Sequence, residues 1–541
     1  MSALPSSAVE MPAWAQNQFD LRSEMNAWIE FSMRWQRGTP WYGIHDEGTF
    51  AESWFSYYLM TGNRDILDFL YHMRDGFLKW SDTNFYHGYY PEGEAHHQVE
   101  TFFQFLCHFW SLDEDRERDI EIVEDAAHHV GNWVPGIPAW YDWERHRMLS
   151  YWLGTRTVRD EPPYDYECFD HFRFIKICLN TYLATGDPRY LEWSVDYADG
   201  WRDVLMAPHH APMVFRFCTD DPEEIDHLYF TEEAKRKIGR GFDIHSAVNY
   251  ALKRGANWEE LREDYNGALG RSTAMIESLQ ELFVLTGEDR FLETSLTLMD
   301  RFEEHSRRTA PRRWKKILRA TTGNTRYDAE LQTVPGDTDA PPPDVMLIES
   351  PFANEHPTQS WGNREANETV VPYTGPDVDD LVTAYRLSGD ISRVKHAYRL
   401  ARPMLHMARV SLRDGREHGC ASGNFAAGPG RTAGYALTKT ALGYREFCCT
   451  LRPKILYRHD GVLGLPEKVA AIYLPEGDNK RVVRLYNAGE ESVELGVCAK
   501  DTDRKITSAT VDGEPHMNIK GNVVSVKLLP GREYRVAARL G

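Results

Sequence analysis

Tyrosine, histidine and glutamate side chains gather in the stretch HGYYPEGEAHHQVETFF, residues 87–103, just before the sequence turns apolar. Phenol, imidazole and carboxyl groups are side chains that commonly move protons in enzymes. A pair of carboxyl groups is also the usual means of cleaving a glycosidic bond. The composition of the stretch leaves three interpretations open: an acid–base site, a metal site, or a polar loop that leads into a helix.

Other segments combine aromatic residues with carboxylates, amides and arginine, namely WYGIHDEG (41–48), PPYDYECFDH (162–171) and SWGNREANET (360–369). Sugar rings stack on aromatic faces, and their hydroxyl groups bond to such polar groups, so we predict a glycan pocket. Its predicted catalytic residues are Glu94, Glu100, Asp165, Asp170, His97 and His171. Its predicted substrate-binding residues are Trp41, Tyr42, Tyr89, Tyr90, Trp361, Asn363, Arg364 and Glu365.

A metal site is the second interpretation of residues 87–103. His96 and Glu100 are four residues apart and would share one helix face, with His97 beside them. The full HExxH pattern of a zinc enzyme is missing from this segment. We predict no required cofactor and assign no metal ligand, and a divalent metal at these three residues stays an alternative.

One local pattern recurs: YLMTGNRDIL from Tyr58, YLATGDPRYL from Tyr182, FVLTGEDRFL from Phe283 and YRLSGDISRV from Tyr385. In each, a helix-like apolar segment meets Thr-Gly or Ser-Gly and then a polar residue. Glycine ends a helix readily in the left-handed conformation, and Asn, Asp or an early Pro favours the start of the next helix. Each piece predicts a tight helix–helix turn. Periodicity predicts about twelve helices, or six hairpins if the first helix pairs with the last.

The connections between predicted helices alternate between these short turns and long segments at 37–47, 81–94, 132–165, 206–265, 307–375 and 411–430. In an up–down arrangement of hairpins, all the long connections lie at one end. Long loops commonly carry binding and catalysis. We therefore expect the predicted catalytic and substrate-binding residues to gather on one rim of the helical domain.

The pattern changes after residue 451. Short, β-branched and alternating segments such as KVAAIYL, RVVRLYN and NVVSVKL are separated by turn sequences such as PEGDN and KGN. This spacing is typical of a small antiparallel β-sandwich. We predict a helical catalytic domain over residues 1–451 and a C-terminal β-sandwich domain over residues 452–541.

Six helical hairpins followed by a β-sandwich resemble the (α/α)6-toroid carbohydrate-active enzymes, which include the six-hairpin glycosidases and the toroid polysaccharide lyases. The resemblance implies a mainly α fold, an (α/α)6 toroid and an oligosaccharide substrate. HGYYPEGEAHHQ is similar to the Asp-Gly-x-Tyr-x-Glu-Gly-x-x-x-His element of toroid heparin and alginate lyases, with His87 in place of Asp.

A second, smaller resemblance concerns cysteine. Cys420, in HGCAS, and the pair Cys448-Cys449 resemble the cysteine–zinc cluster of one toroid arabinofuranosidase family. The last predicted helix lies between them, and such a rod holds its ends far apart. In addition, Val370 stands where that family has its nucleophilic cysteine. The zinc and cysteine chemistry is therefore not carried over to this chain.

Glycoside hydrolysis by carboxylate acid–base catalysis is the function we expect, with an oligosaccharide as substrate. A lyase that cleaves a uronate by β-elimination is the alternative. That reaction needs a base, an acid and a counter-charge, and the residues that could supply them are His87, His97, His171, Tyr89, Tyr90 and Arg364. A uronate epimerase or isomerase, and a non-catalytic glycan-binding toroid, are the remaining alternatives.

Composition excludes other classes. The 541 residues carry a formal net charge of −20, which argues against a nucleic-acid partner, although RRTAPRRWKKILR (307–319) is locally basic. No apolar run approaches the ~18 residues of a membrane span, and no signal peptide precedes the first polar segment. With scattered cysteines, these features predict a cytoplasmic protein without a membrane partner. The oligomeric state stays open.

Overall fold

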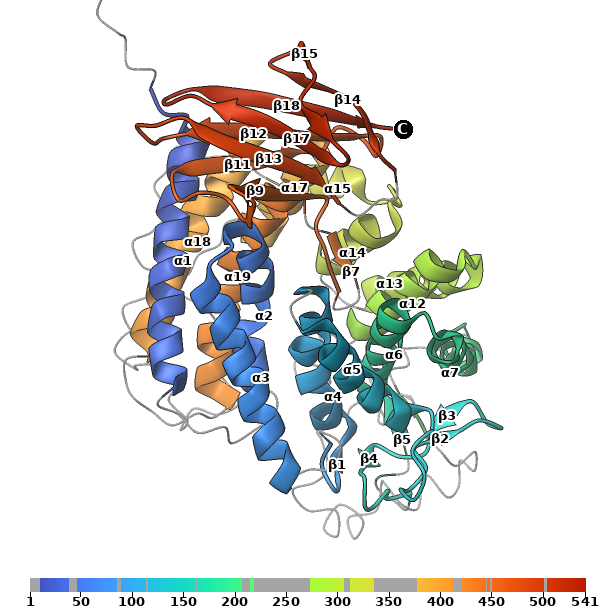
Figure 1. Cartoon of the computed structure of the whole chain (residues 1–541). Helices are drawn as coiled ribbons and strands as arrows, with labels where there is room; N and C mark the ends of the chain where they lie inside the picture. Colours follow the sequence, from blue (N-terminus) through green and yellow to red (C-terminus); the bar gives the residue numbers. More distant parts are fainter. Residues whose placement is uncertain are drawn as a thin grey trace, which may run out of the picture. The chain divides into compact units, whose positions relative to one another are not determined.

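The computed structural model (Figure 1) describes residues 10–37, 46–84, 89–112, 115–160, 164, 166–206, 215–217, 273–305, 312–334, 377–412, 420–443, 445–447, 450–500 and 504–541. These residues divide into two compact units. The first unit is drawn from Met1–Met73, Arg326–Arg445 and Leu451–Gly541, and the second from Arg74–Thr325 and Glu446–Thr450.

Helices make up most of both units. Those of the first unit are α1 (Ala13–Arg37), α2 (Asp46–Thr61), the start of α3 (Arg64–Asn84), α15 (Asp328–Gln332), α17 (Val378–Ser388), α18 (Ile391–Leu412) and α19 (Cys420–Leu442). Those of the second are the rest of α3, α4 (Ala95–Gln104), α5 (Arg116–Val130), α6 (Phe172–Thr185), α7 (Pro188–Met206), α12 (Thr273–Thr286), α13 (Asp289–His305) and α14 (Arg312–Thr322), with the 3-10 helices η1 (Leu106–Leu112) and η2 (Phe169–His171).

Short two-stranded sheets join the helices of the second unit. Their strands are β1 (Gly93–Glu94), β2 (Tyr141–Asp142), β3 (Arg147–Met148), β4 (Trp152–Leu153), β5 (Tyr166–Cys168) and β6 (Phe215–Phe217). The antiparallel pairs are β1 with β4, β2 with β3, and β5 with β6. Two further short strands, β7 (Arg445–Phe447) and β8 (Thr450–Arg452), pair with each other.

The four predicted helix–helix turns are confirmed. Gly62, Gly186, Gly287 and Gly389 all have positive φ, between 66° and 77°. Each glycine N–H donates to the carbonyl four residues earlier at 2.7–2.8 Å. The hydroxyl before each glycine donates to its own i−4 carbonyl, as Thr185 does to Thr181 at 2.8 Å, and accepts from the N–H two residues on. The Thr-Gly or Ser-Gly pair thus satisfies the last carbonyls of one helix and the first N–H of the next segment.

A fifth turn of this type lies where the sequence suggested only a long connection, 307–375. The segment ATTGNTR ends α14 with Gly323 at φ 74°, whose N–H donates to Arg319 O at 3.1 Å. Thr322 repeats the hydroxyl bonds, to Leu318 O and from Asn324 N–H. The long connection predicted over 307–375 therefore contains a helix, α14, with buried Trp314, and the prediction is wrong for residues 312–322.

The first helix of each hairpin is buried more completely than the second. In α6, Phe172 and every residue from Phe174 to Thr181 are buried. In α13, burial follows one stripe, with Phe291, Leu298 and Met299 inside and charged residues opposite. A helix that is apolar on all sides is enclosed by other elements. An amphipathic helix buries one side against its neighbours and leaves the other in solvent. This division agrees with the predicted hairpins, while the closed six-hairpin ring stays a prediction.

Antiparallel strands form the C-terminal region, as predicted. One five-stranded sheet has the order β10 (Val462–Leu463), β9 (Ile455–His459), β13 (Val493–Ala499), β17 (Val523–Leu528), β16 (Ile519–Lys520). The other has the order β11 (Val469–Leu474), β12 (Lys480–Asn487), β18 (Glu533–Leu540), β14 (Ile506–Val511), β15 (Glu514–His516). Figure 1 draws them in red near the C-terminus. The predicted boundary at residue 452 stays a prediction.

Helix α1 covers the free edge of β11. The Gln18 side chain donates to Ala471 O at 2.8 Å and accepts from Ala471 N–H at 2.9 Å, so it replaces a neighbouring strand. Arg22 donates to Val469 O at 2.8 Å. All six residues of β11 are buried. Two side chains of one helix thus protect a sheet edge that would otherwise pair with another chain.

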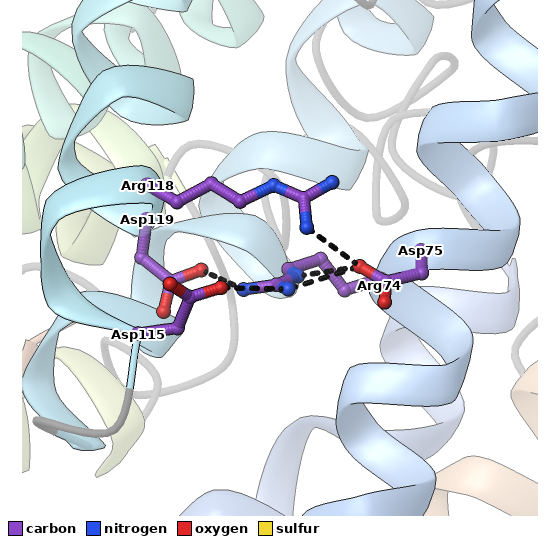
Figure 2. Close-up of polar contacts among 5 residues, drawn as sticks. All are labelled: Arg74, Asp75, Asp115, Arg118 and Asp119. Carbon is purple, nitrogen blue, oxygen red and sulfur yellow. Dashed lines mark hydrogen bonds and ion pairs between the residues drawn. The ribbon is translucent and has the colours of Figure 1, made fainter.

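Arg74 is the buried centre of an ion cluster in the second unit (Figure 2). Its guanidinium contacts Asp119 at 2.5 Å, Asp115 at 3.1 Å and Asp75 at 2.9 Å, and Arg118 approaches Asp75 at 3.6 Å. The side chains of Arg74 and Asp119 are 3% and 0% exposed. Burial alone would lower the pKa of Arg74, but its carboxylate partners raise it, Asp119 foremost. The cluster fastens the last part of α3 to α5.

Replacing the left-handed glycine Gly186 with alanine is expected to lower the free energy of unfolding by about 1 kcal/mol, because an alanine Cβ is strained at positive φ. No atom lies near the added Cβ, so strain alone acts. The matched control is Gly76→Ala, inside α3 and equally open, which should raise the free energy of unfolding by about 0.5–1 kcal/mol. Chemical denaturation measures both. Equal effects of the two substitutions would contradict the proposed role of the turn.

Removing Arg74 is expected to cost far more, because the buried carboxylate of Asp119 would lose the cation that balances it. We expect Arg74→Met to lower the free energy of unfolding by about 3–5 kcal/mol, and Arg74→Met combined with Asp119→Leu to recover a large part of that loss. A double-mutant cycle followed by denaturation measures the coupling. Additive losses would show that the two side chains do not depend on each other.

Candidate functional site

The start of α4 is where the stretch 87–103 meets the rest of the second unit. Strand β1 pairs with β4 so that Glu94 lies opposite Trp152. The first N–H of α4, from Ala95, donates to Tyr151 O at 2.8 Å. The buried Gln98 side chain accepts from Tyr90 N–H at 2.9 Å and donates to Leu153 O at 2.7 Å. These bonds connect residues 90–98 to residues 151–153 and fix the chain where α4 begins. Helix α4 ends at Gln104 and is followed by η1.

The two neighbouring tyrosines of this stretch differ in burial. Tyr89 is fully buried, and its ring lies 4.7–5.0 Å from those of Phe102, His129 and Trp140. Its hydroxyl donates to Ala126 O at 2.9 Å, and burial raises its pKa well above the usual value. Tyr90 is half-buried. Tyr89 thus packs in the core, which does not suit its predicted contact with substrate, and Tyr90 keeps that prediction.

Glu94 and His97 lie on the accessible side of the helix start. Their side chains are 25% and 37% exposed, and Glu94 Oε2 is 3.8 Å from His97 Nδ1. The Tyr151 hydroxyl donates to the same Glu94 oxygen at 3.4 Å. Two predicted catalytic residues are therefore adjacent. The third group, Tyr151, comes from the connection between α5 and α6 and was not predicted.

Glu100 and Asp170 share one arginine. Arg173 Nη1 lies 3.3 Å from Glu100 and 3.5 Å from Asp170. Asp170, in η2, is almost completely buried, whereas Glu100 and Arg173 keep some exposure. The guanidinium balances two carboxylates that would otherwise repel each other. This arrangement brings two predicted catalytic carboxylates together, one from α4 and one from η2.

His171 is buried between these groups and the neighbouring strands. Its Nε2 donates to Ser150 O at 2.9 Å, since a carbonyl can only accept. Its ring centroid is 6.0 Å from that of Tyr151, the residue that bonds Glu94. A fully buried histidine bonded to the main chain is suited to positioning its neighbours. The structure connects His171 to Glu94 through Tyr151.

A second ion pair continues along α6. Lys176 bonds Glu277 of α12, and Arg313 of α14 lies 3.8 Å from the same carboxylate. Burial would raise the pKa of Glu277, but the cations of Lys176 and Arg313 lower it below the usual value. Because Lys176 is three residues after Arg173, both cations share one face of α6. The charged face of α6 therefore runs from the candidate site to α12.

Several predicted site residues lie outside the described residues: Asp165, Trp41, Tyr42, Trp361, Asn363, Arg364 and Glu365. The side chains of His96, Cys420, Cys448 and Cys449 also lie outside the described part. The expected single rim can be followed only for residues 89–100 and 166–173, where the predicted residues do meet.

Sequence reasoning missed three residues of this site. Arg173 follows Asp170 by three positions on a helix, and this spacing is a signal that could have been used. Gln98 gave no signal, because its role depends on main-chain groups distant in sequence. Tyr151 gave none either, since it meets Glu94 only through the pairing of β1 with β4.

No group of three or more histidine, cysteine, aspartate or glutamate residues has metal-binding geometry within the described ranges. The suggested divalent metal at His96, His97 and Glu100 is not tested by this result, because the His96 side chain is not described. Among the described helices, none has the length and apolar character needed to cross a membrane.

Comparison with known proteins gives little further information. No family model matches the sequence, and no curated protein matches it. A solved structure titled Ara127N-Se, a GH127 β-L-arabinofuranosidase from Geobacillus stearothermophilus T6, aligns over 83% of this chain and 73% of its own, at 11% identity and a TM-score of 0.24. A likeness this low carries no conclusion about the site or the reaction.

Arg173→Gln is expected to lower the free energy of unfolding by about 3 kcal/mol, because buried Asp170 would lose the cation that balances it. Arg173→Lys should restore part of the loss, since a single ammonium cannot reproduce the fork. The control is Arg118→Gln, which removes a half-exposed ion pair with Asp75 and should change the free energy of unfolding by less than about 1 kcal/mol. Similar losses at both arginines, measured by denaturation, would contradict a special role for Arg173.

Proposed function

We propose that the protein is a glycoside hydrolase that cleaves an oligosaccharide with a pair of carboxyl groups. The observation that carries the proposal is the row Glu94, His97 and Glu100, which begins at the end of β1 and continues along α4. Both carboxylates have a polar partner from a different segment, and both keep some exposure to solvent. Two fixed, reachable carboxyl groups are the minimum equipment for hydrolysis of a glycosidic bond.

The surroundings of the two carboxyl groups suit different roles. Glu100 lies beside the guanidinium of Arg173, which compensates a negative charge, so Glu100 suits the base or nucleophile. We assign Glu94, which contacts the neutral phenol of Tyr151, as the proton donor to the leaving oxygen, because a carboxyl group beside a guanidinium, such as Glu100, is harder to protonate. Asp170 and His171 are buried, and we assign them to positioning Arg173 and Tyr151. In this proposal Tyr90 borders the sugar.

The toroid architecture, an (α/α)6 ring of hairpins, belongs to this proposal as well. It is supported by the repeated glycine turns and by the enclosed first helices of the hairpins. The substrate is then an oligosaccharide bound at the ends of these helices. A cytoplasmic location and the absence of a required metal remain expectations.

A uronate lyase is the second candidate, because Tyr151, His97 and Arg173 are residue types that serve β-elimination. One observation weighs against it. A lyase needs a positive group for the substrate carboxylate, and Arg173 is already balanced by Glu100 and Asp170. Among the described residues, this arginine is therefore better suited to hold protein carboxylates than a uronate.

Glu94→Gln and Glu100→Gln are each expected to lower turnover by about 10²–10⁴-fold, because an amide cannot donate or accept the catalytic proton. The control is Glu117→Gln, an exposed position on α5, which should leave turnover unchanged. The assay uses neutral and uronate oligosaccharides, with released reducing ends and the ultraviolet absorbance of an unsaturated uronate measured in parallel.

Reducing ends without new absorbance support the hydrolase. New absorbance on a uronate substrate would instead identify a lyase. Unchanged turnover in both glutamate variants would show that α4 does not carry the reaction. Turnover on none of the substrates, with binding retained, would favour the glycan-binding alternative.

A further inference from the structure

The hairpin β2–β3 presents a tryptophan to solvent. Trp143, just after β2, is 41% exposed, whereas most tryptophans among the described residues are buried. Leaving much of an indole in water forfeits a large hydrophobic gain, so an exposed indole calls for an explanation. The other exposed large apolar side chains of the described ranges are not aromatic and lie in α12 and in the strands and turns of the C-terminal region.

Trp143 is nevertheless held in a fixed position. Its Nε1 donates to Gly131 O at 3.3 Å, and the Tyr141 ring meets it edge-on at 5.1 Å. Trp133 lies beside it, with ring centroids 6.2 Å apart and planes tilted by 49°. A Cβ on Gly131 would lie 2.4 Å from the Trp133 ring, so glycine is required for this packing. The two indoles form a rigid corner, which we call the tryptophan platform.

Several side-chain hydrogen bonds hold the hairpin β2–β3 next to the platform in place. Asp196 of α7 accepts from the Tyr141 hydroxyl at 2.6 Å and pairs with His146 at 2.8 Å, so one carboxylate clamps both ends of the turn. The Asn132 side chain bonds Tyr141 O at 2.6 Å and Trp140 N–H at 2.7 Å. Asn132 and His146 have positive φ, 62° and 54°, which costs free energy in residues other than glycine. Rigidity of this kind lowers the entropy lost on binding.

Polar groups border the platform. The Arg189 guanidinium lies over the Trp133 ring at 5.6 Å, and Asp187 holds it at 2.7 Å. Beside them, Tyr190 donates to Glu124 at 2.9 Å and contacts His128 Nε2 at 2.9 Å, and its ring lies 5.5 Å from Trp133. An aromatic face with carboxylates and a guanidinium around it matches a sugar, whose C–H face stacks while its hydroxyls form hydrogen bonds.

We propose that the tryptophan platform, together with Arg189, is a glycan-binding site separate from the carboxyl groups of Glu94 and Glu100. Trp143 stacks one sugar ring, and Arg189 with Asp187 bonds its hydroxyls. The site holds the chain of an oligosaccharide or polysaccharide and performs no chemistry. The choice of a sugar as ligand rests on the proposed function. A protein partner fits less well, because an apolar protein interface would need a larger exposed patch than a single indole.

Affinity electrophoresis in gels that contain soluble arabinan, xylan, glucomannan or alginate tests the proposal. We expect at least one polysaccharide to retard the wild-type protein, and Trp143→Ala to weaken that retardation by about tenfold. Trp143→Phe should keep part of the binding. The control is Val284→Ala, which shortens an exposed apolar side chain of α12 and should change nothing. Turnover of a short oligosaccharide, measured on the same variants, should stay within about twofold of wild type.

The outcomes separate this proposal from the proposed function. Wild-type retardation that Trp143→Ala leaves unchanged, or no wild-type retardation on any gel, overturns the platform as a glycan site even if turnover persists. Loss of retardation in Trp143→Ala supports the platform even if no substrate is cleaved, and then it is the hydrolase that fails. A change in sedimentation of Trp143→Ala, with retardation unchanged, would assign the platform to contact between copies of the chain and overturn the proposal.

Discussion

A helix that is buried on every side must find partners for its last carbonyls within one or two residues of its end. The chain meets this constraint in the same way at Gly62, Gly186, Gly287, Gly323 and Gly389, where a left-handed glycine follows a threonine or serine. The hydroxyl and the glycine N–H satisfy the end of the helix, and at Gly62, Gly186, Gly287 and Gly389 the next helix starts two residues later. Because this end of each hairpin is so short, chain length accumulates at the other end. That is where β1, β4 and η2 bring Glu94, Tyr151 and Asp170 to the starts of α4 and α6.

Buried charge is organised around arginine. The sequence has more acidic than basic residues, 82 against 62, and Arg74 and Arg173 are each shared between carboxylates. Arg74 serves three aspartates and Arg173 serves a glutamate and an aspartate. The planar guanidinium suits this sharing, because it offers several donors in one fork. The Arg74 cluster joins two helices along their sides, and this contribution to stability accounts for it. The Arg173 cluster lies at a helix start, next to partly exposed polar groups, so it can serve chemistry as well as stability.

Local sequence patterns predicted the parts of the fold that depend on local interactions. The glycine turns depend on a few consecutive residues, so four of them were predicted, and the fifth, at Gly323, was missed because it follows an arginine-rich segment that suggested a loop. Burial could not be predicted in the same way. Tyr89 and Tyr90 are neighbours of the same type, yet extended chain sends successive side chains to opposite sides, and only Tyr89 enters the core. Tyr151 and Arg173, which contact Glu94 and Glu100, lie more than fifty positions from them in the sequence, and no local pattern links Tyr151 to Glu94.

The connection between α5 and α6 has a double role that follows from its anchoring. Its first part, 131–148, forms the tryptophan platform and is clamped to α7 by Asp196. Its last part supplies Ser150, Tyr151, Asp170 and His171 to the candidate site. Met148 N–H donates to the buried carboxylate of Glu167 at 3.0 Å, and Glu167 also accepts from Tyr197 of α7 at 3.0 Å. The segment is therefore tied to α7 on both sides of the short link 149–151. A ligand held at Trp143 would be bound to the same rigid connection that orients Tyr151 toward Glu94. One connection can therefore bind the glycan and position a residue of the candidate site.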